Sequence, residues 1–331
     1  MSKKITIPAI LASLIIGYLM ALAGSQGSVE FNGWPLFAVC ASISFLLHWV
    51  IFIPSYGFQT EHYFDLTGSI SYLAAVTIGF TLNPSSDPRD LIIGLLIVVW
   101  AMRLGTFLFM RVKIDGKDKR FTVMKTEFVW YLMTWTIGGL WVFITMAAGL
   151  AAITSNETTA LSWPAFIGIA LWVFGFMIEI IADKQKRDFK KDANKKHAFI
   201  TTGLWAWSRH PNYFGEIVLW IGVTLIALPV LSGWQLATLL SPVFVYVLLT
   251  RISGIPMLEN RAQKKWGSDP DYIAYLERTP KLILKKPKLN IIKKGVFLNW
   301  LSINNKLGGQ NKIPRLNEKR TFIEEIKKLN L

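Results

Sequence analysis

The chain has 331 residues, of which 52% are hydrophobic, and its mean hydropathy is +0.39. Uncharged apolar runs of about 20 residues recur from the N-terminus to about residue 256, and soluble domains lack such runs. The single cysteine excludes an intrachain disulfide and a multi-cysteine metal site, and the four histidines lack the spacing of a helical metal site. We therefore predict an all-α, polytopic transmembrane helix bundle without a bound metal.

Eight segments have the length and composition of membrane-spanning helices. In chain order they are 5–23, 35–54, 66–82, 90–110, 128–153, 162–182, 213–231 and 235–255. A cleaved signal peptide is the alternative for the first segment, although its apolar run is long for one. A re-entrant hairpin around residues 229–234 is the alternative for the last two, so the expected count is seven to eight spans.

The distribution of basic residues predicts the orientation. Lysines and arginines gather at the N-terminus, in the loops 111–125 and 184–196, and in the tail, all of which follow an even number of crossings. The loops on the other side contain one arginine and no lysine. Because basic loops stay in the cytoplasm, both termini of this multi-pass membrane protein are expected there.

Much of the net charge of +15 lies in the tail, where residues 281–331 contain 13 lysines and arginines and 3 acids. We expect this tail to lie against anionic lipid, and we expect no nucleic-acid partner. The chain is divided into an N-terminal segment (1–34), a membrane domain (35–283) and a partly disordered tail (284–331). A short surface helix over 320–329 is the alternative to disorder in the tail. The expected partners are the lipid bilayer and a hydrophobic small molecule.

Four ionisable residues stand out inside the predicted spans: Arg103, Glu179, Glu216 and Arg251. Each costs about 2.5–3.5 kcal/mol near the centre of a bilayer, so such groups usually face a partner or a wet cavity. We predict that they converge in a polar cavity that opens to the cytoplasm. The alternative is that the arginines extend to the headgroups and the glutamates lie at the interface.

Two stretches next to the spans extend this pattern. Glu179, Asp183, Arg187 and Lys190 share one helical face, which predicts either a ligand-binding face or a ladder of ion pairs. The turn 202–216 leads into the seventh span, and Pro211 is suited to the first turn of that helix. Exposed backbone N–H groups there form a candidate anion site with Ser208, Arg209, His210 and Asn212. The alternative is a basic turn at the membrane interface.

Beyond the last span, Tyr272 and Tyr275 share a helical face that begins at Asp269-Pro270. An amphipathic helix on the membrane surface is the alternative to a role for Tyr272 in a site.

The residues 64–68, 100–105, 111–121 and, most specifically, 203–216 resemble the motifs of the steroid 5-alpha-reductase superfamily. The similarity is greatest to its bacterial branch of membrane proteins with a domain of unknown function, and it covers about residues 35–283. The resemblance implies an NADPH-dependent reductase of a double bond in a lipid or steroid-like substrate. In that family the cofactor lies in a cytoplasm-facing cavity of the helix bundle and no Rossmann fold is used, which agrees with the absence of a G-x-G-x-x-G motif here. The resemblance to the bacterial branch also implies a location in the bacterial inner membrane.

From this resemblance and the charge pattern, we expect cofactor contacts from Glu179, Asp183, Arg187, Lys190, Arg209, His210, Asn212, Tyr213, Glu216, Arg251 and Tyr272. Tyr213 and Glu216 are also the candidate catalytic residues, and Tyr63 is a further candidate proton donor. The sequence departs from the steroid enzymes at three positions. Glu179 replaces an asparagine, Lys190 an arginine, and Trp100 the tyrosine thought to polarise the substrate carbonyl.

Two other functions compete with this one. The turn 209–211 followed by Glu259 also resembles the membrane isoprenylcysteine carboxyl methyltransferases, which use S-adenosylmethionine. That family pairs two glutamates where this chain has Glu259-Asn260. The third function is a non-enzymatic lipid-binding or transport bundle. It requires polar residues through the full depth of the membrane, whereas the charges inside these spans occupy one half.

Overall fold

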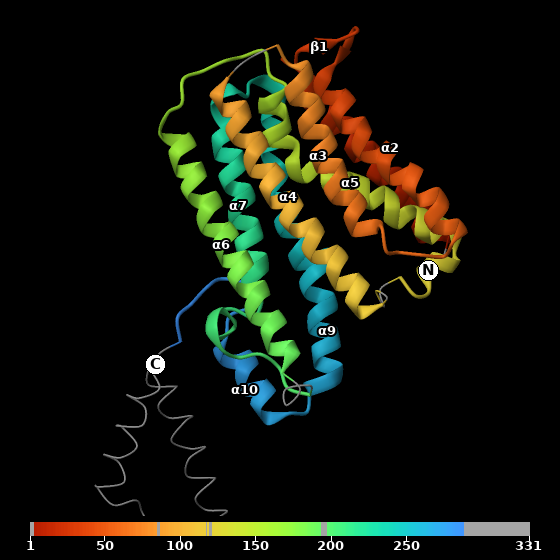
Figure 1. Cartoon of the computed structure of the whole chain (residues 1–331), viewed down its shortest axis with the longest axis vertical. Helices are drawn as coiled ribbons and strands as arrows, with labels where there is room; N and C mark the ends of the chain where they lie inside the picture. Colours follow the sequence, from red (N-terminus) through yellow and green to blue (C-terminus); the bar gives the residue numbers. More distant parts are fainter. Residues whose placement is uncertain (1–2, 85–86, 117, 119–120, 193–196, 288–331) are drawn as a thin grey trace, which may run out of the picture. The chain divides into compact units, whose positions relative to one another are not determined.

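The computed structural model describes residues 3–84, 87–116, 118, 121–192 and 197–287 (Figure 1). Met1–Leu284 forms one compact unit, and Lys285–Leu331 forms a second. Most of the second unit, including the predicted basic tail and its short helix over 320–329, lies outside the described residues.

Helices make up nearly all of the regular structure in the described chain. The elements as far as the seventh span are α1 (Lys3–Ser25), β1 (Glu30–Phe31), β2 (Trp34–Pro35), α2 (Leu36–Gly57), α3 (Phe64–Leu82), α4 (Pro88–Asp115), η1 (Met124–Thr126), α5 (Phe128–Ile153), α6 (Trp163–Lys191), η3 (Gly203–Ala206), α7 (Pro211–Ala227) and η4 (Leu228–Val230). The two strands pair as a small antiparallel hairpin, whose turn uses the positive φ angles of Asn32 and Gly33.

The eighth span is not a single regular helix. It consists of the 3₁₀ segment η5 (Gly233–Leu240), the helix α8 (Ser241–Val247), the π-helical segment η6 (Leu248–Ile252) and the helix α9 (Gly254–Trp266). The short helix α10 (Pro270–Arg278) follows, and Asp269 caps its start by accepting from the N–H of Asp271.

The described chain contains eight elements that are long and apolar enough to cross a membrane, which confirms the prediction of an all-helical, multi-pass protein. Two helices continue beyond the apolar segments that we predicted to span the membrane, and the candidate span in α4 itself ends at Met110, as predicted. α4 continues to Asp115 and α6 to Lys191, because the charged residues that follow the apolar segment remain helical. Apolarity marks the limit of the membrane-embedded part, and it does not mark the end of the helix.

α5 is the central helix of the bundle. In its most apolar window 89% of the residues are buried, against 17% in α1 and 33% in α6. It packs against α1, α2, α3, α4, α7 and α8. The sequence explains this position, because α5 is apolar on all sides and its second half is rich in alanine and glycine, which allow close approach of neighbouring helices.

α6 and α7 lie side by side (Figure 1) and meet through glycines. A Cβ atom on Gly175 would lie 2.5 Å from the carbonyl oxygen of Gly215, and one on Gly168 would lie 2.6 Å from that of Gly222. Only glycine permits this backbone contact. The same register brings the end of α6, with Glu179 and Asp183, next to the first turns of α7.

The single arginine of the lysine-poor loops has a structural role. Arg89 is fully buried, and its guanidinium donates to the carbonyl oxygens of Ile226, at 2.6 Å, and Thr159, at 3.0 Å. Ile226 lies in the last turn of α7, where carbonyls lack helical partners and a positive charge is favourable. Arg89 therefore secures the end of a helix and does not act as a free basic charge.

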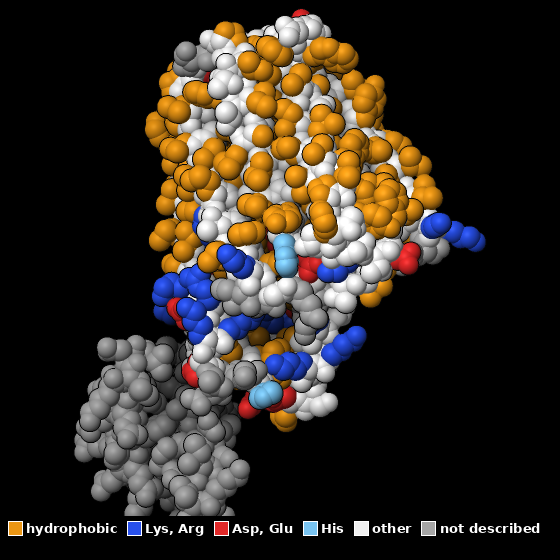
Figure 2. All heavy atoms as spheres, turned by 45° about the vertical axis from the view of Figure 1, so that its right-hand side comes forward, with side chains coloured by type: hydrophobic (Ala, Val, Ile, Leu, Met, Phe, Trp, Pro, Cys, Tyr) orange, Lys and Arg blue, Asp and Glu red, His pale blue; other side chains and the backbone are white. Residues whose placement is uncertain are grey.

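Charged and apolar side chains separate on the surface. Figure 2 shows hydrophobic side chains over the upper part of one face, and lysines, arginines and acids gathered below them. A bundle that spans a bilayer presents this distribution. The assignment of the charged end to the cytoplasm remains a prediction from the sequence.

Candidate functional site

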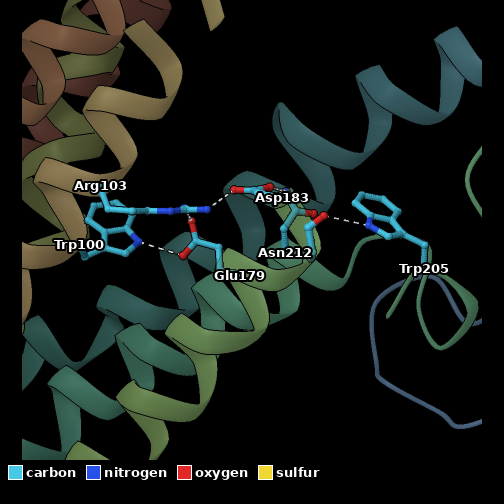
Figure 3. Close-up of polar contacts among 7 residues, drawn as sticks. Trp100, Arg103, Glu179, Asp183, Trp205 and Asn212 are labelled. Atoms are coloured by element: carbon cyan, nitrogen blue, oxygen red, sulfur yellow. Dashed lines mark hydrogen bonds and ion pairs between the residues drawn. The ribbon is translucent and has the colours of Figure 1, made fainter. Parts of the chain in front are cut away.

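A buried polar cluster joins α4, α6 and α7. Arg103 of α4 forms ion pairs with both Glu179 and Asp183 of α6 (Figure 3). The indole N–H of Trp100 donates to Glu179 at 3.1 Å, and the side-chain amide of Asn212 donates to Asp183 at 3.2 Å. The two carboxylates are 3% and 10% exposed. We call these five residues the Arg103 cluster.

Helical spacing assembles this cluster from three short sequence patterns. Trp100 and Arg103 are three residues apart on α4, and Glu179 and Asp183 are four apart on α6, so each pair shares one face of its helix. Asn212 follows Pro211 at the start of α7. The glycine contacts between α6 and α7 then hold Asn212 against Asp183.

Glu216 lies one turn beyond Asn212 on α7. It is 7% exposed, and its carboxylate forms no hydrogen bond within the part of the chain that the structure describes. It lies within electrostatic range of Glu179, Asp183 and Arg103. One arginine thus pairs with two buried carboxylates, and Glu216 is a third buried acid nearby. Such an arrangement costs stability and is typical of functional sites within membranes.

Aromatic side chains adjoin this acidic group. The ring of Trp100 meets the edge of Trp220 at 5.0 Å between centroids, and Tyr72 of α3 stacks on Trp220 at 6.0 Å. The buried hydroxyl of Tyr72 lies beside Thr145 and has no well-formed hydrogen bond among the described residues. Its ring meets that of Trp100 edge to face at 5.3 Å between centroids, which places Tyr72 next to the Arg103 cluster. Sequence reasoning missed Tyr72, whose only signal is a hydroxyl inside an apolar span.

A second polar cluster surrounds Glu259 of α9. Its carboxylate pairs with Arg209 at 2.8 Å, Lys281 at 3.1 Å and His210 at 3.4 Å. The imidazole of His210 stacks on Tyr213 at 5.8 Å between ring centroids. Burial lowers the pKa of His210 below its usual 6.5, although Glu259 opposes this shift. We call Glu259 and its three basic partners the Glu259 cluster.

The structure therefore divides the predicted site residues into groups. Glu179, Asp183 and Asn212 lie in the Arg103 cluster with Glu216 beside them, whereas Arg209 and His210 lie in the Glu259 cluster, with Tyr213 stacked on His210. Arg187 and Lys190 are exposed near the end of α6, and the guanidinium of Arg187 lies 6.0 Å from the ring of Phe107.

Three further candidates lie outside both clusters. Arg251, which we predicted to share the cavity, is exposed, and it lies in the π-helical segment η6. Tyr272 is buried among Phe199, Trp266 and Tyr275. It packs α10 against the end of α9 and against the loop between α6 and η3. Tyr63 is 50% exposed at the start of α3.

The loop before α7 is held on the end of α6. The indole N–H of Trp205 donates to the carbonyl of Ala182 at 3.0 Å (Figure 3), and the Tyr275 hydroxyl donates to the carbonyl of Trp205 at 2.9 Å. The ammonium of Lys186 lies 4.5 Å from the Trp205 ring. These contacts position Asn212 and Arg209 relative to α6, a role for Trp205 that its sequence motif did not reveal.

Comparison with known proteins places the chain in a family. The family model described as "Protein of unknown function (DUF1295)" matches residues 51–279, which include both clusters except Lys281. The chain belongs to the DUF1295 family. This confirms the resemblance inferred from the motifs, because this family is distantly related to 3-oxo-5-alpha-steroid 4-dehydrogenases.

Individual relatives of this DUF1295 protein match it over shorter stretches. The 3-oxo-5-alpha-steroid 4-dehydrogenase 1 of Bos taurus is 37% identical over 93 residues, and that of Rattus norvegicus is 33% identical over 90. An uncharacterized protein of Schizosaccharomyces pombe is 29% identical over 125 residues. The matches cover 28%, 27% and 31% of this chain and 34%, 32% and 36% of the respective relatives, so they span about a third of each relative's length.

Proposed function

We propose that this DUF1295 protein is a membrane-embedded, NADPH-dependent reductase of a carbon–carbon double bond in a lipid or steroid-like substrate. The observation that carries the proposal is the buried, unpaired carboxyl group of Glu216 beside the Arg103 cluster, within a chain distantly related to steroid dehydrogenases. A membrane bundle also gives a hydrophobic substrate a dry reaction site.

The polar residues along α6 suit a dinucleotide. The carboxylates of Glu179 and Asp183 can accept hydrogen bonds from the ribose hydroxyls of the dinucleotide. The side-chain amide of Asn212 can bond to the carboxamide of its nicotinamide ring. Arg187 and Lys190, farther along the helix and exposed, offer cations to phosphates. Helix geometry separates positions 179 and 190 by about 16 Å, which suits an elongated ligand. When bound, NADPH would supply the hydride.

Reduction of a double bond also requires a proton. Glu216 and Tyr72 are the buried groups that can hold one next to the Arg103 cluster, and the aromatic rings around Tyr72 keep water away. Tyr213 stacks on His210, and Tyr63 is half exposed, so we assign the proton to Glu216 and Tyr72. Trp100 and Arg103 orient Glu179 from α4.

Titration of NADPH and NADH into the purified full-length protein in detergent tests the proposal. We expect Arg187→Ala to weaken NADPH binding roughly ten-fold, about 1.4 kcal/mol, and to change NADH binding little, since this side chain would contact the additional phosphate. Arg261→Ala, at an exposed arginine of α9, is the matched control. An equal loss for both nucleotides would remove the phosphate-reading role from Arg187.

A methyltransferase is the second candidate, and the contacts of Glu259 with Arg209 and His210 favour it. S-adenosylmethionine is therefore titrated in parallel. Binding of the methyl donor without NADPH, lost in Glu259→Gln, would replace the reductase proposal. Binding of neither molecule would favour a lipid-binding or transport bundle.

A further inference from the structure

The last membrane-spanning element is interrupted near its charged end. The π-helical segment η6 is followed by Ser253, whose backbone N–H donates to the carbonyl of Leu248, five residues earlier, at 2.9 Å. π-Helical turns are rare and often occur at functional sites. The interruption leaves Arg251 exposed, and Arg251 forms no ion pair among the described residues.

Arg251 lines a groove of about 410 Å³ between this break and the segment that follows α10. The groove has a cationic and an apolar part, formed by Tyr246, Thr250, Arg251, Lys281, Leu282 and Ile283. Its lining contains no acidic residue. Tyr246 is 42% exposed and Ile283 is 68% exposed, so apolar surface lies open beside the two cations.

Hydrogen bonds hold the wall formed by residues 280–283 in place. The carbonyl of Pro280 accepts from the N–H of Arg209 at 2.9 Å, and the carbonyl of Leu282 accepts from the hydroxyl of Ser208 at 2.8 Å. The Lys281 side chain is 51% exposed and reaches Glu259 at 3.1 Å. This wall of the groove is therefore fixed by the fold, because it is hydrogen-bonded to the fully buried Ser208.

We propose that this groove binds an anionic phospholipid, with the headgroup phosphate at Arg251 and Lys281 and an acyl chain along Tyr246 and Ile283. A lipid presents a phosphate next to hydrocarbon, which matches the cations and exposed apolar side chains of the lining. The groove also lies along an element that is long and apolar enough to span the bilayer, so lipid reaches it laterally. This proposal does not depend on the reductase function.

The test uses the full-length protein, purified in detergent and incubated with phosphatidylglycerol or phosphatidylcholine, with bound lipid counted by native mass spectrometry. We expect preferential retention of phosphatidylglycerol, reduced roughly five-fold by Arg251→Gln, which removes one lipid-facing cation. Arg261→Gln removes an equal charge from α9 outside the groove and should retain the lipid. NADPH binding should be unchanged in Arg251→Gln.

Four results would overturn the proposal. The first is equal retention of the two lipids, and the second is an equal loss in both arginine variants, which would indicate a general charge effect. The third is weakened NADPH binding in Arg251→Gln with unchanged lipid retention, which would return Arg251 to the cofactor site. Displacement of the lipid by millimolar inorganic phosphate would indicate a free-anion site and would also contradict a lipid site.

Discussion

The two polar clusters are inverse arrangements of the same charges. In the Arg103 cluster one guanidinium forms ion pairs with two carboxylates, and Glu216 is a third acid nearby. In the Glu259 cluster one carboxylate pairs with three basic side chains. The first is buried between helices, while the side chain of Glu259 is 25% exposed. The Arg103 cluster has an excess of acidic groups, so it favours ligands with neutral hydrogen-bond donors such as hydroxyl and amide groups. The Glu259 cluster has an excess of basic groups, so it favours anionic ligands. Arg209 and Asn212 serve different clusters although they are close in sequence.

The largest expected effect is the loss of the shared cation. Arg103→Gln leaves Glu179 and Asp183 buried without their partner, so we expect a loss of about 3–5 kcal/mol in the free energy of unfolding, measured by denaturation in detergent. The control Arg261→Gln should change little. If charge imbalance is the cause, adding Glu179→Gln and Asp183→Asn to Arg103→Gln restores much of the stability. A triple variant no more stable than Arg103→Gln would contradict this explanation.

The next effect separates catalysis from binding. In a reductase assay we expect Glu216→Gln and Tyr72→Phe to lower turnover about 100-fold or more, because each removes a group that can hold the proton. NADPH affinity should change less than turnover, since neither side chain is among the proposed phosphate contacts. Tyr63→Phe, at a half-exposed position, is the control. Unchanged turnover in both buried variants would remove these residues from proton transfer.

The smallest effect distinguishes the second cluster by its pH dependence. The unfolded chain binds a proton at His210 near pH 6.5, and the folded protein binds it only at lower pH because burial lowers the pKa. Between the lower pKa of the folded protein and pH 6.5, the unfolded state therefore holds more protons than the folded state. The free energy of unfolding falls as the pH drops through this range, and the contribution of His210 is constant above it.

Unfolding midpoints between pH 5 and pH 8 measure this dependence. His210→Gln should reduce it, whereas His62→Gln, at an exposed histidine, should leave it as in the parent protein. An identical pH profile in the His210 variant would show that other groups cause the loss of stability.

Some parts of this structure follow from local patterns, and others depend on contacts between helices. Hydropathy predicted the eight spans, because the bilayer imposes a length and a composition on each of them. Helical periodicity placed Glu179 and Asp183 on one face of α6, and their intramembrane charge pointed to a partner. Arg103 is likewise a charged residue inside a predicted span, on α4, which also indicated a charged partner.

The rest could not be read from the sequence. The π-helical break that exposes Arg251 has no distinctive sequence pattern, and Tyr272 joined an aromatic group whose members come from separate segments. Tyr72 became a candidate only when α3, α4 and α7 were brought together. The division of residues 209–212 between two clusters depends on the position of Glu259, which is far along the chain.

The glycine contacts between α6 and α7 decide how a molecule can reach Glu216. Where Gly175 touches the backbone of Gly215, no acyl chain or steroid ring can pass between the two helices. On the other side, α4 meets α6 through the side chains of Trp100 and Arg103, which can rotate where a backbone cannot. For the proposed reductase, we therefore infer that a membrane-dissolved substrate enters beside α4, close to Arg103.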